Sequence, residues 1–265
     1  MKNRIDKELV VRNLAPSRSK AQELIESSLV KVNDSIVVKC NYMVSSDDEI
    51  TILENDKLKY VSRGGLKLEK AINEFHINFT NKNVMDIGSS TGGFCDCALK
   101  HGARRIVAID VGSDLLHESL RKRKEIELHE QTNFKTLDNK YFNNIDIITC
   151  DVSFISLNKI LNKIHDEDVI VDMVCLIKPQ FECGKDLADK YRGIILDKNV
   201  HISVINKVIN EINGLGFYIR GITYSPIKGG DGNIEYLCYI SNKEGIKSNI
   251  NIDVNYLVKK AFKSK

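Results

Sequence analysis

The sequence predicts an α/β fold, in which a mostly parallel sheet with helices on both faces follows a small α+β unit. Three observations predict it. Beyond residue 60, short apolar runs alternate with stretches of helical periodicity, as in parallel sheets covered by helices. The run Val84–Ile87 leads through the glycine-rich segment Gly88–Gly93 into a helical pattern. Residues 4–53 carry short helical and alternating patterns of their own, and the charged segment 54–60 follows them as a linker.

The small unit, residues 1–59, is predicted to hold two helices and a hairpin sheet. The expected elements are a helix over 5–14 that ends before Ala15-Pro16, a helix over 18–28 capped by Ser17, a hairpin over 30–37 that turns at Asn33-Asp34, and a strand over 49–53. Up to residue 45 there are eight basic residues against five acidic ones, and acids follow, so we expect a near-neutral unit with one basic face. Such charges form a solvated surface or contact phosphates, and composition leaves both interpretations open.

The large unit, residues 60–265, repeats one pattern of strands and helices. A paired glycine, Gly64-Gly65, introduces its first helix. Strands are expected over 84–87, 106–111, 126–128, 145–150, 169–177, 218–223 and 235–240, and helices over 94–101, 156–165, 199–212 and 254–262. In a sheet of this kind, ligands bind at the carboxyl ends of the strands.

Composition excludes several classes of protein. With 265 residues, 42% of them hydrophobic, the chain can build an ordinary core. No run approaches the roughly 18 apolar residues of a membrane span, and the N-terminus lacks a signal peptide, so we expect a cytoplasmic protein without membrane contact. The seven cysteines are scattered without a C-x-x-C pair, which predicts buried reduced thiols and no metal site. The net charge of +3 is too small to indicate nucleic acid by itself.

The segment Gly88–Gly93 predicts a cofactor loop. Glycine has no Cβ, so the turn can bring a ligand against backbone N–H groups at the start of the helix. The G-S-S-T-G-G spacing matches neither the phosphate loop nor G-x-G-x-x-G. Asp110 ends the next apolar run about 20 residues on, where such folds place the carboxylate that binds a ribose. Together these features suggest S-adenosyl-L-methionine.

Four ionisable residues stand where chemistry is expected. Asp151 and Lys178 each follow an apolar run that ends at the carboxyl edge of the sheet, and Pro179 biases Lys178 away from helix. Lys67 follows the paired glycine, and Glu235 lies in a glycine-rich turn before a late strand. Each residue alone would form a surface salt bridge, but four together in one crevice are poorly explained by stability. Such a group could lower the pKa of a lysine and leave a neutral amine that takes a proton.

The order of five motifs resembles the hemolysin-A-type (TlyA) family of rRNA ribose 2′-O-methyltransferases. The motifs are Ser62–Lys67, Asp86–Phe94, Asp151–Leu157, Ile177–Glu182 and Ser225–Glu235. The first sixty residues are similar to the S4-type RNA-binding domain, and the rest is similar to FtsJ-like, Rossmann-like class I methyltransferases. The resemblance implies methylation of a cytidine ribose in ribosomal RNA. The short N-terminus resembles the shorter members, which favours 23S rRNA over modification of 16S rRNA as well.

The resemblance also implies the roles of individual residues. The catalytic set that it implies is Lys67, Asp151, Lys178 and Glu235. Our hypothesis for the division of roles is that Lys178 is the base or activates the hydroxyl, that Asp151 orients it, and that Lys67 and Glu235 fix the ribose. Contacts to S-adenosyl-L-methionine are expected from Asp86, Gly88, Ser89, Ser90, Thr91, Gly92, Gly93, Phe94, Asp110, Val111 and Asn133. Contacts to RNA are expected from Arg4, Arg18, Ser19, Lys20, Lys31 and Arg63. The partner is ribosomal RNA or a ribosomal subunit, and a monomer without metal is expected.

Three other functions remain open from the sequence. The first is an rRNA-binding assembly factor whose methyltransferase domain is inactive, which the intact set of four residues disfavours. The second is a membrane-active hemolysin, for which the basic tail is the supporting feature. The third is methylation of a small molecule, which would leave the basic unit without a purpose.

Overall fold

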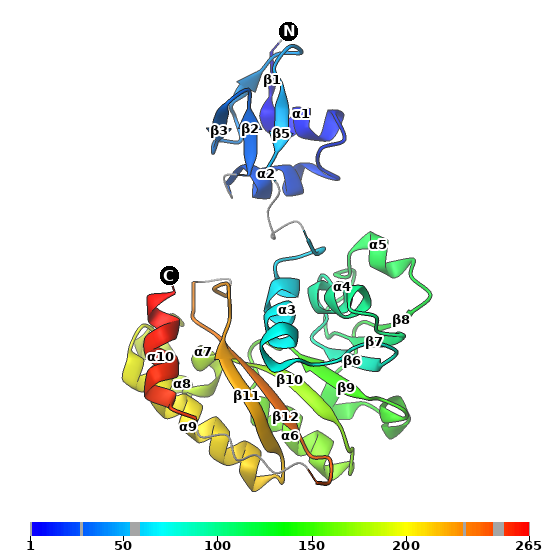
Figure 1. Ribbon diagram of the computed structural model, residues 1–265, viewed down its shortest axis with the longest axis vertical. Helices are drawn as coiled ribbons and strands as arrows, with labels where there is room; N and C mark the ends of the chain where they lie inside the picture. Colours follow the sequence, from blue (N-terminus) through cyan, green and yellow to red (C-terminus); the bar gives the residue numbers. More distant parts are fainter. Residues whose placement is uncertain (1, 27–28, 54–58, 230–231, 246–251, 265) are drawn as a thin grey trace. The chain divides into compact units, whose positions relative to one another are not determined.

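The computed structural model describes residues 2–26, 29–53, 59–229, 232–245 and 252–264 (Figure 1). The chain forms two compact units, Met1–Leu58 and Lys59–Lys265. The predicted end of the second helix, at residues 27–28, and most of the predicted linker lie outside the described residues.

The smaller unit joins two helices and a three-stranded antiparallel sheet in one core. Its elements are β1 (Asn3–Arg4), α1 (Ile5–Val11), α2 (Arg18–Glu26), β2 (Val30–Val32), β3 (Ser35–Val37), β4 (Met43–Val44) and β5 (Ile50–Ile52). Strands β2 and β3 form the predicted hairpin, and Ser17 Oγ accepts from Lys20 N as the predicted helix cap. Helix α1 ends earlier than predicted, because Asn13 takes a left-handed φ of 57° and turns the chain.

The larger unit is built on a seven-stranded sheet in the order β11-β12-β10-β9-β6-β7-β8. The strands are β6 (Asn83–Ile87), β7 (Arg105–Ile109), β8 (Ile126–His129), β9 (Ile147–Cys150), β10 (Asp172–Ile177), β11 (Tyr218–Tyr224) and β12 (Tyr236–Ser241). Strand β12 runs antiparallel between β10 and β11, and the other neighbouring pairs are parallel. The predicted mostly parallel sheet is confirmed. The strand order reverses between β6 and β9, which is where sheets of this kind bind ligands.

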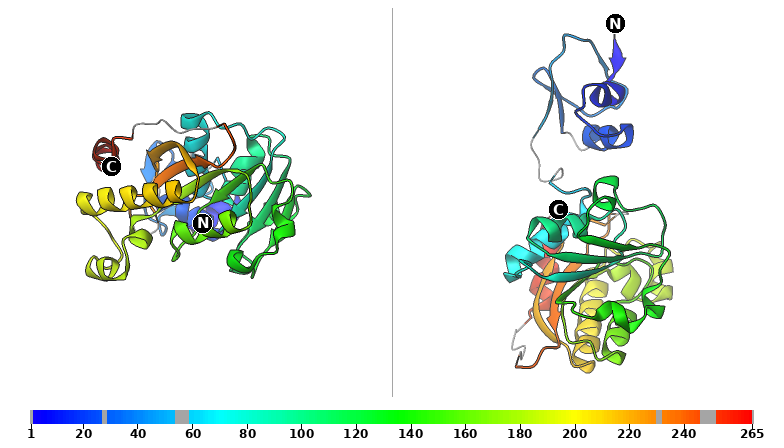
Figure 2. Two further views of the ribbon diagram at one scale, coloured as in Figure 1. Left: turned by 90° about the horizontal axis from the view of Figure 1, so that it is seen from below. Right: turned by 90° about the vertical axis from the view of Figure 1, so that its right-hand side faces the viewer.

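Helices cover both faces of this sheet, as Figure 2 shows. The helices are α3 (Gly64–Phe75), α4 (Gly93–Lys100), α5 (Glu118–Arg121), α6 (Leu157–Asp166), α7 (Pro179–Glu182), α8 (Lys185–Lys190), α9 (Lys198–Gly214) and α10 (Val254–Lys263). Alternate strand residues point to opposite faces. Met85 and Ile148 pack in one core with α6 and α9, whereas Val84 and Ile147 pack in another with α3 and α4. Helix α10 contacts α9 and the edge strand β11.

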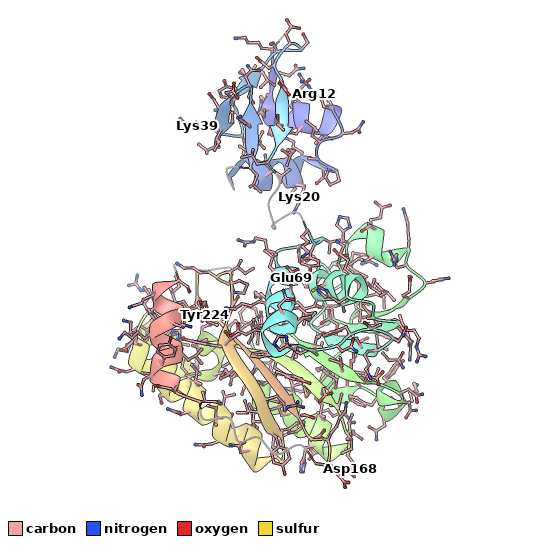
Figure 3. All side chains as sticks on the ribbon, viewed as in Figure 1. Arg12, Lys20, Lys39, Glu69, Asp168 and Tyr224 are labelled. Atoms are coloured by element: carbon pink, nitrogen blue, oxygen red, sulfur yellow. The ribbon has the colours of Figure 1, made fainter. Side chains whose placement is uncertain are left out.

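Because most of its strands are parallel, the sheet has one edge formed by the carboxyl ends of strands and an opposite edge formed by their amino ends. Figure 3 shows Tyr224, which ends β11, at one edge, and Asp168, which precedes β10, at the other. The cofactor loop, Asp151 and Lys178 follow the last residues of β6, β9 and β10, so they all lie at the edge formed by the carboxyl ends. The short helices α7 and α8 were not predicted. Pro179 at the first position of α7 follows Lys178 in extended conformation, so the predicted end of this strand is confirmed.

Candidate active site

Two connected cavities lie at the carboxyl ends of the strands. One has a volume of about 290 Å³ and the other about 420 Å³. Both are lined by Gly88, Ser90, Asp151, Ser153 and Phe154, so they are two lobes of one crevice. We call the first the cofactor lobe and the second the catalytic lobe.

The four predicted catalytic residues come together in the catalytic lobe. Lys67 Nζ lies 3.2 Å from Asp151 Oδ2 and 2.7 Å from Glu235 Oε2. Lys178 Nζ lies 2.6 Å from Asp151 Oδ1 and donates to Ser153 Oγ at 3.1 Å. The two lysines and Glu235 are buried, and Asp151 is largely buried. The result is one alternating chain of charges that joins four separate segments of the sequence.

The electrostatics of this chain differ from the sequence prediction. Burial disfavours the charged form of Lys67, but the attraction of Asp151 and Glu235 outweighs burial and raises the pKa of Lys67. Burial would raise the pKa of Asp151, but the two lysines outweigh it and lower that pKa. The predicted lowering of a lysine pKa is therefore wrong at Lys67, because its neighbours are opposite charges at hydrogen-bond distance.

Close packing of glycines places Lys67 beside the cofactor loop. A Cβ on Gly93 would lie 2.4 Å from Ser62 Oγ and 2.8 Å from the backbone N of Gly65. A Cβ on Gly65 would lie 2.3 Å from the ring of Tyr60. Only glycine allows the first turn of α3 to approach the first turn of α4 this closely. The side chain of Lys67, in the first turn of α3, consequently reaches the residues that follow β9 and precede β12.

Glu235 lies just before β12 begins. Because β12 runs antiparallel to β10, its first residues lie beside the carboxyl end of β10, and Glu235 therefore lies near Lys178 and Asp151. Asn233, which the sequence analysis missed, holds the turn ahead of it. Its Oδ1 accepts from Ile195 N at 2.9 Å and its Nδ2 donates to Gly193 O at 2.8 Å. A Cβ on Gly229 would lie 2.5 Å from Glu235 Oε1, so Gly229 lies directly beside the carboxylate. The G-D-G-N spacing gave no signal for these long-range partners.

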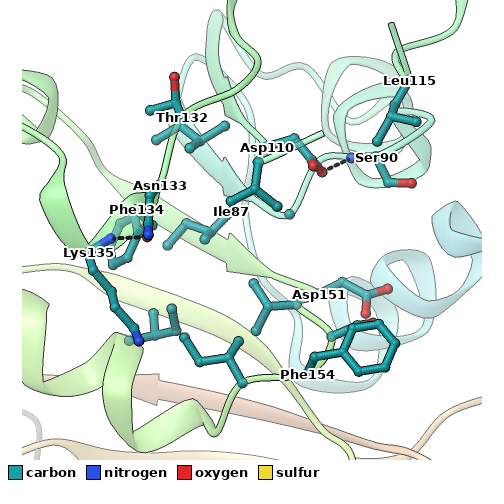
Figure 4. Close-up of a pocket in the computed structure, with 17 residues that line it drawn as sticks. Ile87, Ser90, Asp110, Leu115, Thr132, Asn133, Phe134, Lys135, Asp151 and Phe154 are labelled. Carbon is teal, nitrogen blue, oxygen red and sulfur yellow. Dashed lines mark hydrogen bonds between the residues drawn. The ribbon is translucent and has the colours of Figure 1, made fainter. Parts of the chain in front are cut away.

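The predicted cofactor loop follows β6 and is held by Asp110 (Figure 4). Asp110 Oδ2 accepts from Ser90 N at 2.7 Å and Oδ1 accepts from Gly112 N at 2.8 Å. Gly88 has a φ of 79°, and a Cβ there would lie 2.9 Å from the carbonyl oxygen of Asp151. The glycine therefore serves both the turn and the contact with β9.

The cofactor lobe has the character of a nucleoside site. Ile87, Ile109 and Phe134 are among its apolar residues, and Asp110 and Asn133 are polar groups at its rim. A volume of about 290 Å³ lies near the lower end of the range for small-molecule sites. Apolar walls for a base and a strand-end carboxylate for a ribose fit S-adenosyl-L-methionine.

Most of the predicted cofactor residues line one of the two lobes. The cofactor lobe includes Gly88, Ser90, Asp110, Val111 and Asn133, and the catalytic lobe includes Gly88, Ser89, Ser90, Thr91, Gly93 and Phe94. Among the described residues, Asp86 and Gly92 line neither lobe. A Cβ on Gly92 would lie 2.4 Å from Leu120, so its role is close packing.

Asp86 lies beneath the loop and has interior partners. It is 1% exposed, and its carboxylate accepts from Thr149 Oγ1 at 2.7 Å and from Cys95 Sγ at 3.0 Å. Burial raises its pKa to about 6 despite these hydrogen bonds. Its position supports the loop through β9 and α4.

Phe154 is a second residue that the sequence analysis missed. Its side chain is 91% exposed and its φ is 63°, which is strained for a bulky residue. It lines both lobes, and its ring lies 5.0 Å from that of Phe181. A strained, exposed aromatic residue at the mouth of a crevice is a candidate for ligand contact.

The predicted RNA-binding residues have varied surroundings. Arg4 and Arg18 both pair with the buried Asp6, and the hydrogen bonds from Arg4 lower the pKa of Asp6 to about 2. Both guanidinium groups remain partly exposed. Lys31 pairs with Asp34, and Arg63 lines the catalytic lobe. Ser19 and Lys20 lie in the first turn of α2.

Other features of the described residues concern metals, cysteines and membranes. The described parts of the chain contain no group of three or more His, Cys, Asp or Glu side chains that could hold a metal ion. The seven cysteines are free thiols, five of them buried, and burial raises the pKa of Cys238 to about 12. Within the ranges given above, none of the helices combines the length and the apolar character that crossing a bilayer requires.

The strand order, the glycine loop beside a strand-end carboxylate and the charged crevice define a Rossmann-like methyltransferase. Residues 60–242 match the FtsJ-like methyltransferase family, and residues 3–50 match the S4 domain. The chain belongs to the TlyA and hemolysin A family of FtsJ-like methyltransferases. The family resemblance seen in the sequence is thereby confirmed.

Similar proteins match nearly the whole chain. Hemolysin A of Brachyspira hyodysenteriae is 42% identical over 239 residues, which cover 89% of this chain and 98% of that protein. The 23S rRNA (cytidine-2′-O)-methyltransferase TlyA of Campylobacter jejuni is 37% identical over 247 residues, which cover 87% and 96%. A solved structure of a protein from Streptococcus thermophilus, proposed to be a hemolysin, has a TM-score of 0.76 at 34% identity and covers 99% of this chain and 96% of that chain.

Proposed function

We propose that this protein methylates the ribose 2′-oxygen of a cytidine in ribosomal RNA, with S-adenosyl-L-methionine as the methyl donor, and that the target lies in 23S rRNA. The ion-pair chain of Lys67, Asp151, Lys178 and Glu235 carries the proposal, because it lies in a crevice continuous with a cavity whose lining suits a nucleoside. The reaction named for the relative from Campylobacter jejuni supports the same chemistry. The complete set of four residues argues against an assembly factor without catalysis.

S-adenosyl-L-methionine, when bound, supplies a methyl group on a positively charged sulfur that a hydroxyl can displace. Asp110 would hold its ribose, and the loop from Gly88 to Gly93 would contact its methionine part. Asp151, between the two lobes, would stabilise the positive charge near the reacting atoms. Holding both reactants in one crevice removes much of the entropic barrier.

Each charged residue of the catalytic lobe then has a role. Lys178 is the base that takes the proton of the 2′-hydroxyl, and Asp151, whose Oδ1 lies 2.6 Å from Lys178 Nζ, orients it. Lys67 stays charged between Asp151 and Glu235, which suits it to bind the ribose oxygens. Glu235 accepts from Lys67 and sets its direction. These assignments need only hydrogen bonds and proton transfer from the chain.

Phe154 suits recognition of the target base. An enzyme that acts on a nucleotide within a folded RNA must take that nucleotide out of its stack. The exposed ring of Phe154, close to Phe181 and beside Asp151, offers a surface on which the displaced base stacks. Arg63, in the same lobe, would contact the adjoining phosphate.

The test replaces the proposed base. Lys178→Ala should keep the affinity for S-adenosyl-L-methionine in calorimetry, while methyl transfer to rRNA falls by about 100-fold or more. Lys185→Ala, at an exposed position on α8, is the matched control and should transfer at the normal rate. Ribose methylation mapped across rRNA from cells with and without the protein identifies the nucleotide.

The outcomes separate the parts of the proposal. Normal methylation by Lys178→Ala would rule out Lys178 as the base while the reaction stands. A map without any ribose methylation that depends on the protein would overturn the reaction itself. Methylation in 16S rRNA alone would show that the reaction is right and that 23S rRNA is the wrong target.

A further inference from the structure

A groove outside the active site lies between α3, the end of β11 and α10, with a volume of about 450 Å³. Its lining includes Lys70, Glu74, Tyr224, Asp253, Tyr256 and Lys260. None of these residues belongs to the cofactor or catalytic lobe. The volume lies within the range of small-molecule sites and suffices for a nucleotide.

Two pairs of a lysine and a tyrosine line this groove. Lys70 Nζ lies 3.5 Å from the centre of the Tyr224 ring and donates to Tyr224 O at 2.7 Å. Lys260 Nζ lies 5.2 Å from the centre of the Tyr256 ring. Tyr256 is 56% exposed. Each pair thus combines an aromatic ring with a cation, the combination by which proteins bind the bases and phosphates of single-stranded nucleic acids.

The groove contains two lysines and two carboxylates, and the two lysines repel each other. Burial lowers the pKa of Lys70, the positive charge of Lys260 lowers it further, and Glu74 raises it. Glu74 Oε2 lies 3.8 Å from Lys70 Nζ, and Asp253 is occupied as the cap of α10, where it accepts from Tyr256 N. Lys260 forms no ion pair with any residue that the structure describes. An anion between the two lysines would reduce their repulsion.

The groove adjoins the catalytic lobe along two segments. Lys67 and Lys70 lie one turn apart on α3, the first in the catalytic lobe and the second in the groove. Strand β11 ends at Tyr224, which lines the groove, and Ile227, three residues later, lines the catalytic lobe. Three residues span at most about 11 Å. A strand whose target nucleotide enters the catalytic lobe would therefore have its neighbouring nucleotides within reach of the groove.

We propose that this groove binds a nucleotide of the RNA strand next to the methylated one, with its base on Tyr256 or Tyr224 and its phosphate between Lys70 and Lys260. Glu74, whose side chain is partly exposed, accepts from the ribose hydroxyl. The inference rests on the proposed function for the direction of the strand. A protein segment is the competing occupant, but two lysines beside two aromatic rings favour RNA.

The test uses the full chain with Tyr256→Ala and Lys260→Ala. Tyr256→Ala should raise KM for rRNA by about tenfold and leave kcat and the affinity for S-adenosyl-L-methionine unchanged, because it removes one base–ring contact. Tyr256→Phe should restore KM, since the ring remains. Lys260→Ala should weaken binding of a single-stranded RNA 12-mer and reduce the salt dependence of that binding by about one phosphate.

Two matched controls separate the groove from general surface effects. Tyr218→Ala removes an exposed tyrosine at the other end of β11, and Lys259→Ala removes the lysine about 100° further round α10. Both should behave like the unmodified protein. If Tyr256→Ala and Lys260→Ala change neither KM nor RNA affinity while methylation proceeds, the groove is no RNA site and the proposed function stands. If the unmodified protein methylates no rRNA, the proposed function fails. The groove is then tested by binding of the 12-mer alone, which Lys260→Ala should weaken and which an unchanged affinity would contradict.

Discussion

Lys67 is the residue that joins the two carboxylates of the site. Its ammonium lies between Asp151 and Glu235, so Lys67→Met would leave the buried Glu235 without this cation and Asp151 with Lys178 alone. We expect the unfolding free energy of the larger unit to fall by about 3–5 kcal/mol in urea denaturation, and methyl transfer to disappear. A second change, Glu235→Gln, should recover part of the stability without activity. Unaltered stability in Lys67→Met would contradict a structural role for this ion pair.

Asp86 predicts a dependence of stability on pH. Its pKa is about 6 in the folded protein and 3.8 without the fold, so folding favours the protonated form. The stabilisation is therefore complete below pH 3.8 and is lost as the pH rises through 6. Relative to Asp86→Asn, the protein should lose roughly 2 kcal/mol of unfolding free energy between pH 4 and pH 7. Urea denaturation of both proteins across this range measures the difference, and a constant difference would contradict the raised pKa.

At this scale, residues at strand ends were predictable and residues with distant partners were not. Asp110, Asp151 and Lys178 follow apolar runs, and parallel strands place such residues at one edge of the sheet. The partners of Asp86 come from β9 and α4, and nothing near it in the sequence indicates them. The positive φ of Phe154 likewise depends on how its loop packs.

At the scale of elements, the turn before β12 limits how Glu235 is held. Gly229→Ala would place a Cβ 2.5 Å from Glu235 Oε1 and displace the carboxylate. We expect methyl transfer to fall by about 100-fold, because a misplacement of about 1 Å has that effect, while cofactor affinity is retained. Gly214→Ala is the control, since a Cβ there meets no atom within 4 Å. Equal rates for the two variants would show that the turn does not position Glu235.

Long periodic elements were predictable, whereas short ones and the order of strands were not. The strands and helices of the larger unit match the predicted ranges within a few residues, because each has a clear apolar period. Helices α5, α7 and α8 have only four to six residues, which is too short for a repeating pattern of apolar residues to be recognised in the sequence. The insertion of β12 between β10 and β11 leaves no local trace, since strand order depends on packing across the whole sheet.

At the scale of the whole molecule, the two units should unfold separately. The core of the smaller unit contains only residues from 5 to 52, and the cores of the larger unit contain only residues from 60 to 262, as far as the structure describes them. We expect two transitions in calorimetry, with S-adenosyl-L-methionine raising the Tm of the larger unit alone. A single transition that shifts as a whole on addition of the cofactor would contradict this independence.

The position of β12 also determines when the protein can first act during its synthesis. Lys67, Asp151 and Lys178 are all made before residue 235, but the sheet that aligns them remains open until β12 enters between β10 and β11. Chains emerge from the ribosome in order, so the carboxylate that completes the ion-pair chain arrives among the last 31 of the 265 residues. A ribosome that releases a chain shortened ahead of β12 would therefore release one that cannot modify RNA.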